Sequence, residues 1–255
     1  MALNEKQLKL FESEIDSWRI RKKDMEKRKT YDEVFDESTL LVLYKMQSDG
    51  VIGMMEYPIA TGKEGNVYKA KSPEKKNLAV KIFRTATATF KHLSGYIVGD
   101  KRFRSIRPRS RHIIRAWAQK EFRNLEVMRS ARVRVPRAVK CTDNVLVMEY
   151  IGDDSMPAPV LRTVGADDPG KVFSDVALNM KRINDSGLVH ADLSEYNVLM
   201  WRGKPYIIDV GQAVTLEHPM AGEFRQRDVR NVVRYFTSLG VETSEPELMA
   251  RIRGD

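Results

Sequence analysis

Three polar side chains in the second half of the chain stand at spacings that suit phosphoryl transfer. Asp192 and Asn197 are five positions apart in LVHADLSEYNVL (188–199), and Asp209 ends the apolar run YIID. An aspartate can accept or orient a hydroxyl proton, and carboxylate and amide oxygens are ligands for Mg²⁺. The order matches H-R-D-L-x-x-x-N followed by D-F-G, with Val210 and Gly211 after Asp209. Either motif alone also fits strand-end turn chemistry, but the set predicts a site for ATP and Mg²⁺.

A lysine and a glutamate could complete such a site. Lys81 lies in the middle of the apolar run NLAVKIF (77–83), like the phosphate-binding lysine of V-A-I-K. At about 100° per residue, Glu121 falls in the centre of the apolar face of a helix over 113–131. A carboxylate on a buried face is costly unless it is paired, so we predict that Glu121 pairs with Lys81. The alternatives are a Lys81 that points to solvent and a partly exposed Glu121.

A glycine-rich segment, ATGKEGNVYKA (60–70), lies between two strand-like runs. Gly62, Gly65 and Val67 match the second glycine, third glycine and valine of G-x-G-x-x-G-x-V, while Ala60 replaces the first glycine. Glycines let a backbone approach phosphates closely. Taken alone, the segment also fits an ordinary glycine hairpin.

The elements that must position these residues follow from hydrophobic periodicity. Strand-like runs come first and amphipathic helices dominate later, which predicts an α+β fold with two unlike lobes. We expect strands at 53–59, 66–70, 78–83, 146–150 and 206–210, and helices at 8–18, 39–49, 113–131, 172–185 and 228–239.

Composition narrows the class of protein. The chain has 255 residues, a formal net charge of +9 and one cysteine, Cys141. A single cysteine excludes an internal disulfide framework and a cysteine-rich zinc site. No segment approaches the roughly 20 apolar residues that span a bilayer, and the first residues lack an apolar signal core. We therefore expect a cytoplasmic protein with no membrane partner.

The positive charge is concentrated in one stretch. Residues 84–115 contain nine Lys or Arg against one acid, Asp100, with Phe90, Tyr96 and Phe103 interleaved. One interpretation is a surface for phosphates of a nucleic acid or nucleotide, and the other is a solvated basic loop. Both interpretations stay open at this point.

Taken together, these motifs resemble those of the RIO family of atypical serine/threonine protein kinases. The residues within them are similar to those of the RIO-one subfamily. The resemblance runs from about residue 38 to the end of the chain. Its most specific pieces are TGKEGNVY, LVHADLSEYN, IIDVGQAV and HPMAGEFRQRDVRN (218–231). It implies a bilobal kinase-like fold with a β-rich N-lobe and a truncated, mostly helical C-lobe that lacks the peptide-docking helices; no A-P-E motif follows Gly211.

The resemblance also implies a division of the chain. Residues 1–37 would form a helical, partly mobile extension. Residues 38–150 would form the N-lobe, including a flexible basic insert at 84–112, and residues 151–255 the C-lobe. Gly65 stands where the family commonly has Ala.

Roles for single residues follow from the same resemblance. Lys81 would bind the ATP phosphates and pair with Glu121, Asp192 would be the catalytic aspartate, and Asn197 and Asp209 would hold Mg²⁺, which Mn²⁺ could replace. The backbones of Glu149 and Ile151 would bind adenine. The nucleotide-binding residues would also include Gly62, Lys63 and Val67.

The implied activity is an ATP- and Mg²⁺-dependent serine/threonine kinase that autophosphorylates. The resemblance also implies ATP hydrolysis through an aspartyl-phosphate on Asp209. The implied partner is a precursor of the small ribosomal subunit, with RNA contact through 84–115. Two alternatives from other classes are a non-catalytic scaffold on ribosomal precursors and a small-molecule kinase of the aminoglycoside type.

Overall fold

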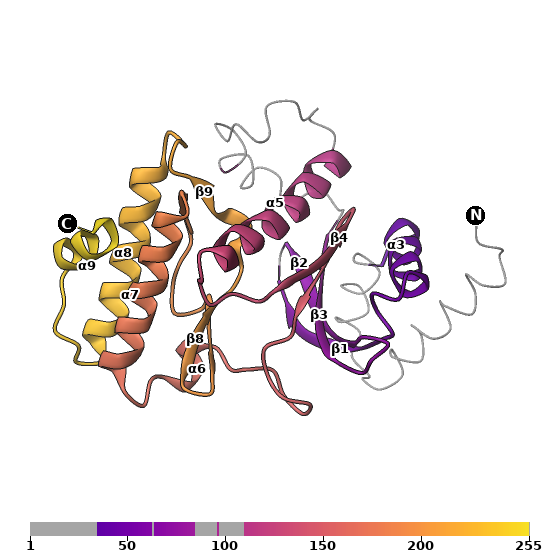
Figure 1. Ribbon diagram of the computed structural model, residues 1–255, viewed down its shortest axis with the longest axis horizontal. Helices are drawn as coiled ribbons and strands as arrows, with labels where there is room; N and C mark the ends of the chain where they lie inside the picture. The colour runs from indigo at the N-terminus through magenta and orange to yellow at the C-terminus, as the bar shows by residue number, and fades with distance from the viewer. Residues whose placement is uncertain (1–34, 63, 85–95, 97–109, 255) are drawn as a thin grey trace.

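The N-lobe is a five-stranded antiparallel sheet with one helix on each side. The computed structural model describes residues 35–62, 64–84, 96 and 110–254. The strands stand in the order β1-β2-β3-β5-β4. Figure 1 shows α3 on one side of the sheet and α5 on the other. The bounds are α3 (Glu37–Ser48), β1 (Met54–Thr61), β2 (Gly65–Lys71), β3 (Asn77–Phe83), α5 (Ser110–Ser130), β4 (Ala138–Thr142) and β5 (Val145–Glu149).

The central strand β3 separates two hydrophobic clusters by simple alternation. Val80 and Ile82 pack with α3, whereas Phe83 packs with α5 and the C-lobe. Lys81 lies between Val80 and Ile82 in the sequence, so its side chain takes the α5 face. The strand is paired along its length, to β2 on one side and β5 on the other. A lysine in this position is therefore held by a rigid, fully hydrogen-bonded backbone.

The segment that follows β5 turns back onto the sheet. The carboxylate of Asp154 accepts hydrogen bonds from Lys71 (2.8 Å) and Asn77 (2.9 Å) at the ends of β2 and β3. Its backbone carbonyl accepts a bond from Lys69, whose side chain is 1% exposed. The next residue, Ser155, accepts a bond from the hydroxyl of Tyr57 (3.3 Å). Residues 153–155 are thereby fastened to the N-lobe although they follow its last strand.

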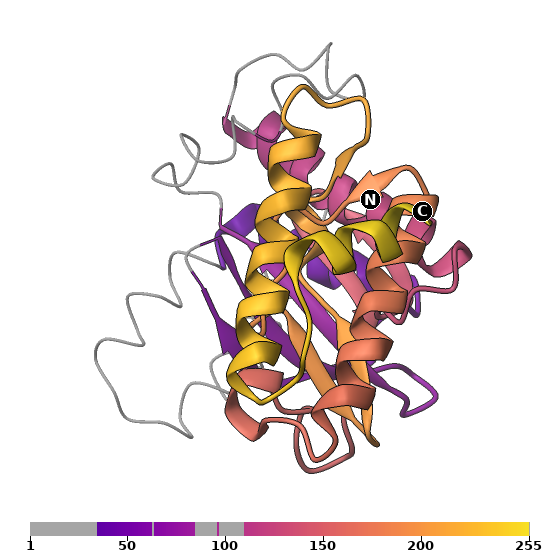
Figure 2. The same ribbon diagram turned by 90° about the vertical axis from the view of Figure 1, so that its left-hand side faces the viewer.

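The C-lobe consists of helices and two short ladders, β6 with β9 and β7 with β8. Figure 2 shows α7 and α8 side by side with α9 lying across them. The ladders present two loops, 190–197 and 208–213, toward the N-lobe side of the helices. The bounds are α6 (Leu161–Val164), α7 (Pro169–Asp185), β6 (Leu188–Val189), β7 (Val198–Trp201), β8 (Lys204–Ile207), η3 (Val210–Gln212), β9 (Val214–Thr215), α8 (Ala221–Ser238) and α9 (Glu245–Arg253).

Local sequence signals explain where the main helices begin. Asp168 caps α7 by accepting a bond from the Lys171 amide, and Pro169 occupies the first turn. Ser244 caps α9 in the same way, and acids occupy the first turn of α9 while arginines occupy its last. These caps fix where α7 and α9 begin.

The predicted α+β fold with two unlike lobes is confirmed. The last predicted strand ends earlier than expected, at Ile207, because Val210 belongs to the 3₁₀ turn η3. The sequence missed β4 and β7, which are short, and α9. The predicted helix at 8–18 and the extension over 1–34 lie outside the described residues, and the domain boundaries stay predictions. Within the described part of the chain, no helix is long and apolar enough to cross a membrane.

Candidate active site

Lys81 is the centre of an ion cluster between the lobes, in which Lys81 and Glu121 are buried and Asp209 is partly exposed. Its Nζ lies 2.8 and 2.7 Å from the two carboxylate oxygens of Glu121 on α5, and 2.8 Å from Oδ1 of Asp209 after β8. Lys81 is 8% exposed and Glu121 is 1% exposed. The structure thus brings together the lysine and glutamate that strand alternation and helical spacing predicted, and it adds Asp209 to them.

The three charges fix one another's protonation. Burial by itself lowers the pKa of Lys81, but attraction to Asp209 and Glu121 outweighs it, and the net effect raises that pKa. The ammonium of Lys81 holds the pKa of Asp209 below its usual value against burial. Burial raises the pKa of Glu121, and Lys81 only partly offsets the effect. Lys81 therefore carries a full positive charge, with Asp209 ionised beside it.

The turn after β8 has a backbone conformation that residues other than glycine rarely adopt. Asp209 has φ 57° and ψ 54°, in the left-handed region. Two residues on, a Cβ at Gly211 would lie 2.9 Å from Oε2 of Glu121 and 3.1 Å from Nε1 of Trp117. Glycine is needed here because the turn lies directly against α5.

The second loop carries Asp192, and α8 holds it through the backbone. Ala191 also has a left-handed φ, of 68°. The amides of Ala191 and Leu193 each donate a 2.8 Å bond to the carboxylate of Asp228. Arg227 donates to the carbonyl of Ala191, and Asn231 donates to the carbonyl of Leu193 (3.1 Å). Three side chains of one helix therefore fix the peptide units on both sides of Asp192.

Asp192 and Asn197 lie together at the end of this loop. The amide nitrogen of Asn197 donates to the carbonyl of Asp192 (2.8 Å) and, at 3.4 Å, to its carboxylate. Burial and the nearby Asp209 raise the pKa of Asp192, while Arg227 and Asn197 act in the opposite direction. The Asn197 carbonyl accepts the amide of Ile208 (3.0 Å), which joins this loop to the Asp209 turn.

His190 supports both loops as a neutral ring. Its Nδ1 accepts the amide of Asp192 at 3.3 Å, and its Nε2 lies 3.1 Å from the carbonyl of Ile208. These two contacts require the tautomer with the proton on Nε2. Burial lowers the pKa of His190 to about 4, so the ring is uncharged near neutral pH. It is a structural support rather than a base.

Asp209 and Asn197 supply oxygen donors that fit a hard cation. No group of three or more His, Cys, Asp or Glu in the described residues could hold a metal alone. Mg²⁺ at phosphate sites usually takes one or two protein oxygens and completes its shell with phosphates and water. Because the nitrogen of Asn197 is bound within the loop, its amide oxygen is the atom that would meet a cation. This donor set suits Mg²⁺ bound together with a nucleotide.

The glycine-rich segment closes one end of the site. The Gly62 amide donates to the Gly65 carbonyl (2.9 Å), and Val67 faces Lys81 across the ladder. A Cβ at Gly65 would lie 2.3 Å from the Ile82 carbonyl oxygen, so the alanine common in the resembling family would need the strands to shift. Lys63 lies outside the described residues.

Glu64, in the same segment, was not singled out by the sequence. Its pKa is raised to about 7 by burial and by Asp209, against the effect of Lys81. Near neutral pH this acid is therefore only partly ionised, on the glycine-rich side of the site.

The predicted adenine contacts lie on the segment that joins the lobes. Glu149 ends β5 and its amide donates to the Arg137 carbonyl (2.8 Å), while the Ile151 carbonyl accepts the Ala158 amide (2.9 Å). The prediction concerns the backbones of these two residues. The structure places both beside the buried end of β5, where Ile151 is 6% exposed.

Most of the predicted basic surface lies outside the described residues. Tyr96 is described, and it packs against the protein, stacked on Phe224 at 5.2 Å between ring centroids and edge-on to Trp117 at 6.3 Å. Arg115 pairs with Asp143 at 2.6 Å. Tyr96 is thus used in packing rather than as a free aromatic surface.

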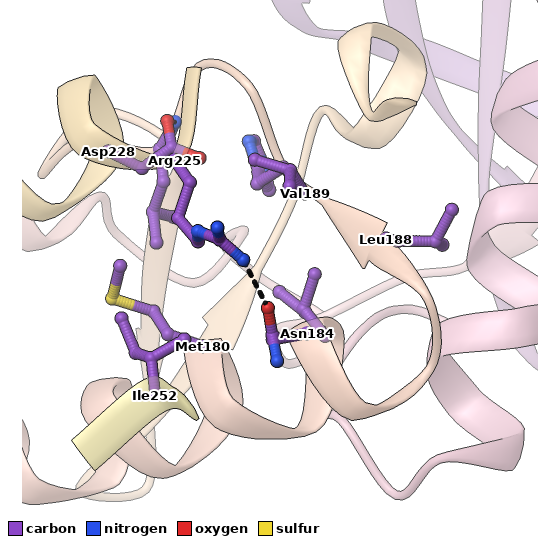
Figure 3. Close-up of a pocket in the computed structure, with 10 residues that line it drawn as sticks. Met180, Asn184, Leu188, Val189, Arg225, Asp228 and Ile252 are labelled. Atoms are coloured by element: carbon purple, nitrogen blue, oxygen red, sulfur yellow. Dashed lines mark hydrogen bonds between the residues drawn. The ribbon is translucent and has the colours of Figure 1, made fainter. Parts of the chain in front are cut away.

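A small cavity lies behind the 190–197 loop, between α7, α8 and α9. Figure 3 shows its lining, with Arg225 donating a 2.9 Å bond to Asn184. His190 and Asp228 also line it. Its volume is about 20 Å³, room for about one water molecule, so it is no substrate pocket.

The supporting residues on α8 were missed by the sequence analysis, although a signal for one of them was present. At about 100° per residue, Asp228 falls within the apolar face of Phe224, Val232 and Tyr235. The reasoning that found Glu121 would have found Asp228 as a second buried acid in need of partners. Its partners, being backbone amides, leave no trace in the sequence.

The comparisons with known proteins agree with these motifs. The family model described as RIO domain matches residues 66–248. The RIO-type serine/threonine-protein kinase Rio1 of Haloferax volcanii is 40% identical over 242 residues, covering 95% of this chain and 83% of that protein. Serine/threonine-protein kinase RIO1 of Homo sapiens is 39% identical, and the match covers 88% of this chain but 40% of the human protein.

One solved structure has a similar fold. The Rio2 kinase of Chaetomium thermophilum, in an ADP/Mg²⁺-phosphoaspartate complex, superposes with a TM-score of 0.67 and 22% identity. The match covers 84% of this chain and 65% of that one.

Proposed function

Because this chain belongs to the RIO family of serine/threonine protein kinases, we propose that Lys81, Asp192, Asn197 and Asp209 carry out its phosphoryl transfer from ATP. The observation that carries the proposal is the contact of Lys81 Nζ with both Glu121 and Asp209 at 2.7–2.8 Å. A lysine fixed by a helical glutamate beside a metal-binding aspartate is the arrangement that phosphoryl transfer requires.

The nucleotide would lie between the lobes. Lys81 would bind its phosphates, with Gly62, Lys63 and Val67 covering them. Adenine would bond the Glu149 carbonyl and the Ile151 amide. This placement is supported by the position of the glycine-rich segment above Lys81 and of the lobe connection beside β5.

Asn197 and Asp209 would hold Mg²⁺, for which Mn²⁺ could substitute. When bound, such an ion neutralises charge on the phosphates. The ionised state of Asp209, maintained by Lys81, suits this role. Lys81 would keep Asp209 oriented until phosphate oxygens share the ammonium.

Asp192 would act on the acceptor. The hydroxyl oxygen of a serine or threonine attacks the γ-phosphorus, the bond to the bridging oxygen breaks, ADP leaves, and the hydroxyl proton passes to Asp192. Its raised pKa moves Asp192 toward the range of an effective base.

The test is Asp192→Ala, assayed for transfer of labelled phosphate to the protein itself. We expect loss of transfer, with ATP binding and thermal unfolding retained, because Asp192 is only partly buried and its carboxylate accepts one long bond, at 3.4 Å from Asn197. Undiminished transfer would refute the role. A non-catalytic scaffold predicts that the unchanged protein transfers no phosphate either, and an aminoglycoside-type kinase predicts transfer to small molecules only.

A second activity, ATP hydrolysis through Asp209, is favoured by two observations. Asp209 is ionised beside Lys81, and the similar Rio2 kinase was solved with a phosphoaspartate. An Asp209 oxygen would attack the γ-phosphorus and release ADP, after which water would cleave the acyl phosphate to inorganic phosphate. Hydroxylamine releases an acyl phosphate but not phosphoserine. Label that resists hydroxylamine would contradict this route.

We also propose that the protein acts in the cytoplasm on a precursor of the small ribosomal subunit, through RNA contact by the basic stretch 84–115. The support is the charge of this stretch and family membership. If Arg102, Arg104, Arg107 and Arg109 touch phosphates, RNA affinity falls steeply with salt, and replacing them by Ala reduces the slope. A flat salt response would support the solvated loop instead.

A further inference from the structure

Helix α5 holds the Asp209 turn with two side chains that sequence analysis did not single out. The Nζ of Lys120 donates a 2.7 Å bond to the carbonyl of Gly211. The amide nitrogen of Asn124 donates to the carbonyls of Val210 (2.8 Å) and Ala213 (3.2 Å). Every carbonyl of this set belongs to the short segment that directly follows Asp209.

Both donors are fully buried, and because buried polar groups are costly, their presence needs an explanation. Lys120 is 1% exposed and Asn124 is 0% exposed. A buried ammonium is costly, and an apolar side chain of the same length would fill the space at lower cost. The Lys120 Nζ also lies 4.8 Å from the centre of the Trp117 ring, which favours its charge. A polar pair at this position is best explained by the bonds it makes to the turn.

The turn needs external support. Asp209 has the left-handed conformation of φ 57° and ψ 54°, which costs a non-glycine residue on the order of 1 kcal/mol or more. That conformation persists only where the surroundings over-determine it. Lys120 and Asn124 hold the carbonyls of Val210, Gly211 and Ala213 from one side. A Cβ at Gly211 would lie 2.9 Å from Oε2 of Glu121, so the turn already lies close against α5.

The same helix face also carries Glu121, the partner of Lys81. Residues 120, 121 and 124 occupy adjacent turns of α5, so one rigid helix contacts both the lysine and the metal-binding turn. We propose that Lys120 and Asn124 are positioning residues that hold the backbone of 210–213, and through it Asp209, in register with Lys81. They act through the turn and touch neither substrate nor cation. The inference rests on the proposed metal role of Asp209.

The test is the dependence of ATP turnover on Mg²⁺ concentration. Lys120→Met and Asn124→Leu keep side chains of similar length and branching and remove the donors. We expect each to raise the Mg²⁺ concentration for half-maximal turnover by roughly 5- to 50-fold, because the cation ligand is no longer pre-oriented. Affinity for ADP measured in excess chelator should change less than twofold, because the adenine contacts lie on the lobe connection.

A graded series keeps the test decisive if one variant folds poorly. Asn124→Gln retains an amide donor on a side chain one methylene longer, so its Mg²⁺ midpoint should fall between those of the unchanged protein and Asn124→Leu. Arg123→Met, on the exposed side of α5, is the matched control and should leave the midpoint unchanged. Loss of thermal stability with an unchanged Mg²⁺ midpoint would overturn the inference.

Asp209→Asn separates the two levels of the argument. If Asp209→Asn leaves the Mg²⁺ dependence unchanged, the proposed metal role of Asp209 fails. If Asp209→Asn shifts the midpoint while Lys120→Met and Asn124→Leu do not, only the positioning inference fails. A shift in all three supports both.

Discussion

The two ends of the active site are built on different principles. At the Lys81 end, side chains from β3, α5 and the Asp209 turn meet directly, with opposite charges 2.7–2.8 Å apart. At the Asp192 end, the side chain of Asp192 makes few contacts of its own, and the peptide units around it are held by Asp228 and Asn231 of α8. The arrangement of the Lys81 end therefore depends on charged side chains. The arrangement of the Asp192 end depends on a backbone conformation that α8 holds in place.

This difference predicts different responses to mutation. Removing a charge at the Lys81 end leaves its partners buried and uncompensated, so stability suffers with activity. Loosening the Asp192 end frees a loop whose core packing stays intact, so activity should suffer more than stability. The two ends are joined through Ile208, whose amide bonds Asn197 and whose carbonyl bonds His190.

The largest expected effect is at Lys81. Lys81→Met should lower the free energy of unfolding by about 3–5 kcal/mol, because Glu121 stays buried without its cation. Lys81→Met combined with Glu121→Leu should recover a large part of that loss while phosphoryl transfer stays absent. Urea unfolding measures both. A double variant less stable than the single one would show that the ion cluster does not govern stability at this end.

The next effect is the pH dependence of stability set by His190. The pKa of this ring is about 4 in the fold and 6.5 in the ordinary state, so the unfolded chain gains a proton first as the pH falls. Its contribution to stability is therefore complete above pH 6.5 and is lost between pH 6.5 and 4, by roughly 3 kcal/mol. The stability difference between the unchanged protein and His190→Gln should shrink over this window. A difference independent of pH would contradict the buried neutral ring.

A smaller effect on stability but a clear one on turnover is expected at Asp228. Burial raises its pKa to about 7, against the two loop amides and Arg227. Asp228→Asn loses one acceptor for the loop, worth about 1.5–3 kcal/mol, so kcat should fall roughly 10- to 100-fold. In the unchanged protein, kcat should also decline as the pH falls below about 7, because protonation removes the same acceptor.

The pH profile identifies the group responsible. Asp228→Asn should remove the decline near pH 7 while ADP affinity stays constant. Asp175→Asn, which breaks a 3.0 Å pair with Arg134 elsewhere in the lobe, is the matched control and should keep the profile. An unchanged acid decline in Asp228→Asn would assign it to another group.

The smallest effect is expected where charges meet outside both ends. Lys181 and Asp185 form an exposed pair four residues apart on α7, with 2.9 Å between Nζ and Oδ2. Lys181→Ala should change the free energy of unfolding by about 0.3–0.5 kcal/mol and leave turnover unchanged. A loss as large as that of Lys81→Met would mean that burial does not distinguish these ion pairs.

The sequence predicted the side-chain half of the site better than the backbone half. Lys81 and Glu121 could be predicted because strand alternation and helical spacing each place a charge on a buried face, where it requires a partner. Asp209 and Asn197 could be predicted from motif spacing. The left-handed conformations of Ala191 and Asp209 could not be predicted. The side chain of Ala191 disfavours a positive φ, and Asp tolerates one without requiring it, so the sequence marks neither position.

Length does not explain the missed strands, because β4 and β7 are as long as β5 and β8, which were predicted. Strand β4 lies at the edge of the sheet and has no fully buried residue, so no apolar run marks it in the sequence. Lys120 and Asn124 sit on a predicted helix, yet their acceptors are carbonyls about 90 residues away, a pairing that composition and spacing do not encode.

Residues 153–155 are bonded to the sheet, and these bonds determine where the two lobes can move relative to each other. This segment is bonded to the N-lobe by Tyr57, Lys69 and Lys71. The carbonyl of Pro159, by contrast, accepts the Met200 amide, so Pro159 belongs to the C-lobe. Between them lie only Met156, Pro157 and Ala158. Proline fixes φ near −65° at 157 and again at 159, so few soft torsions remain in this connection. If the two lobes open and close over a nucleotide, they would therefore rotate about a short, stiff hinge rather than about a flexible linker.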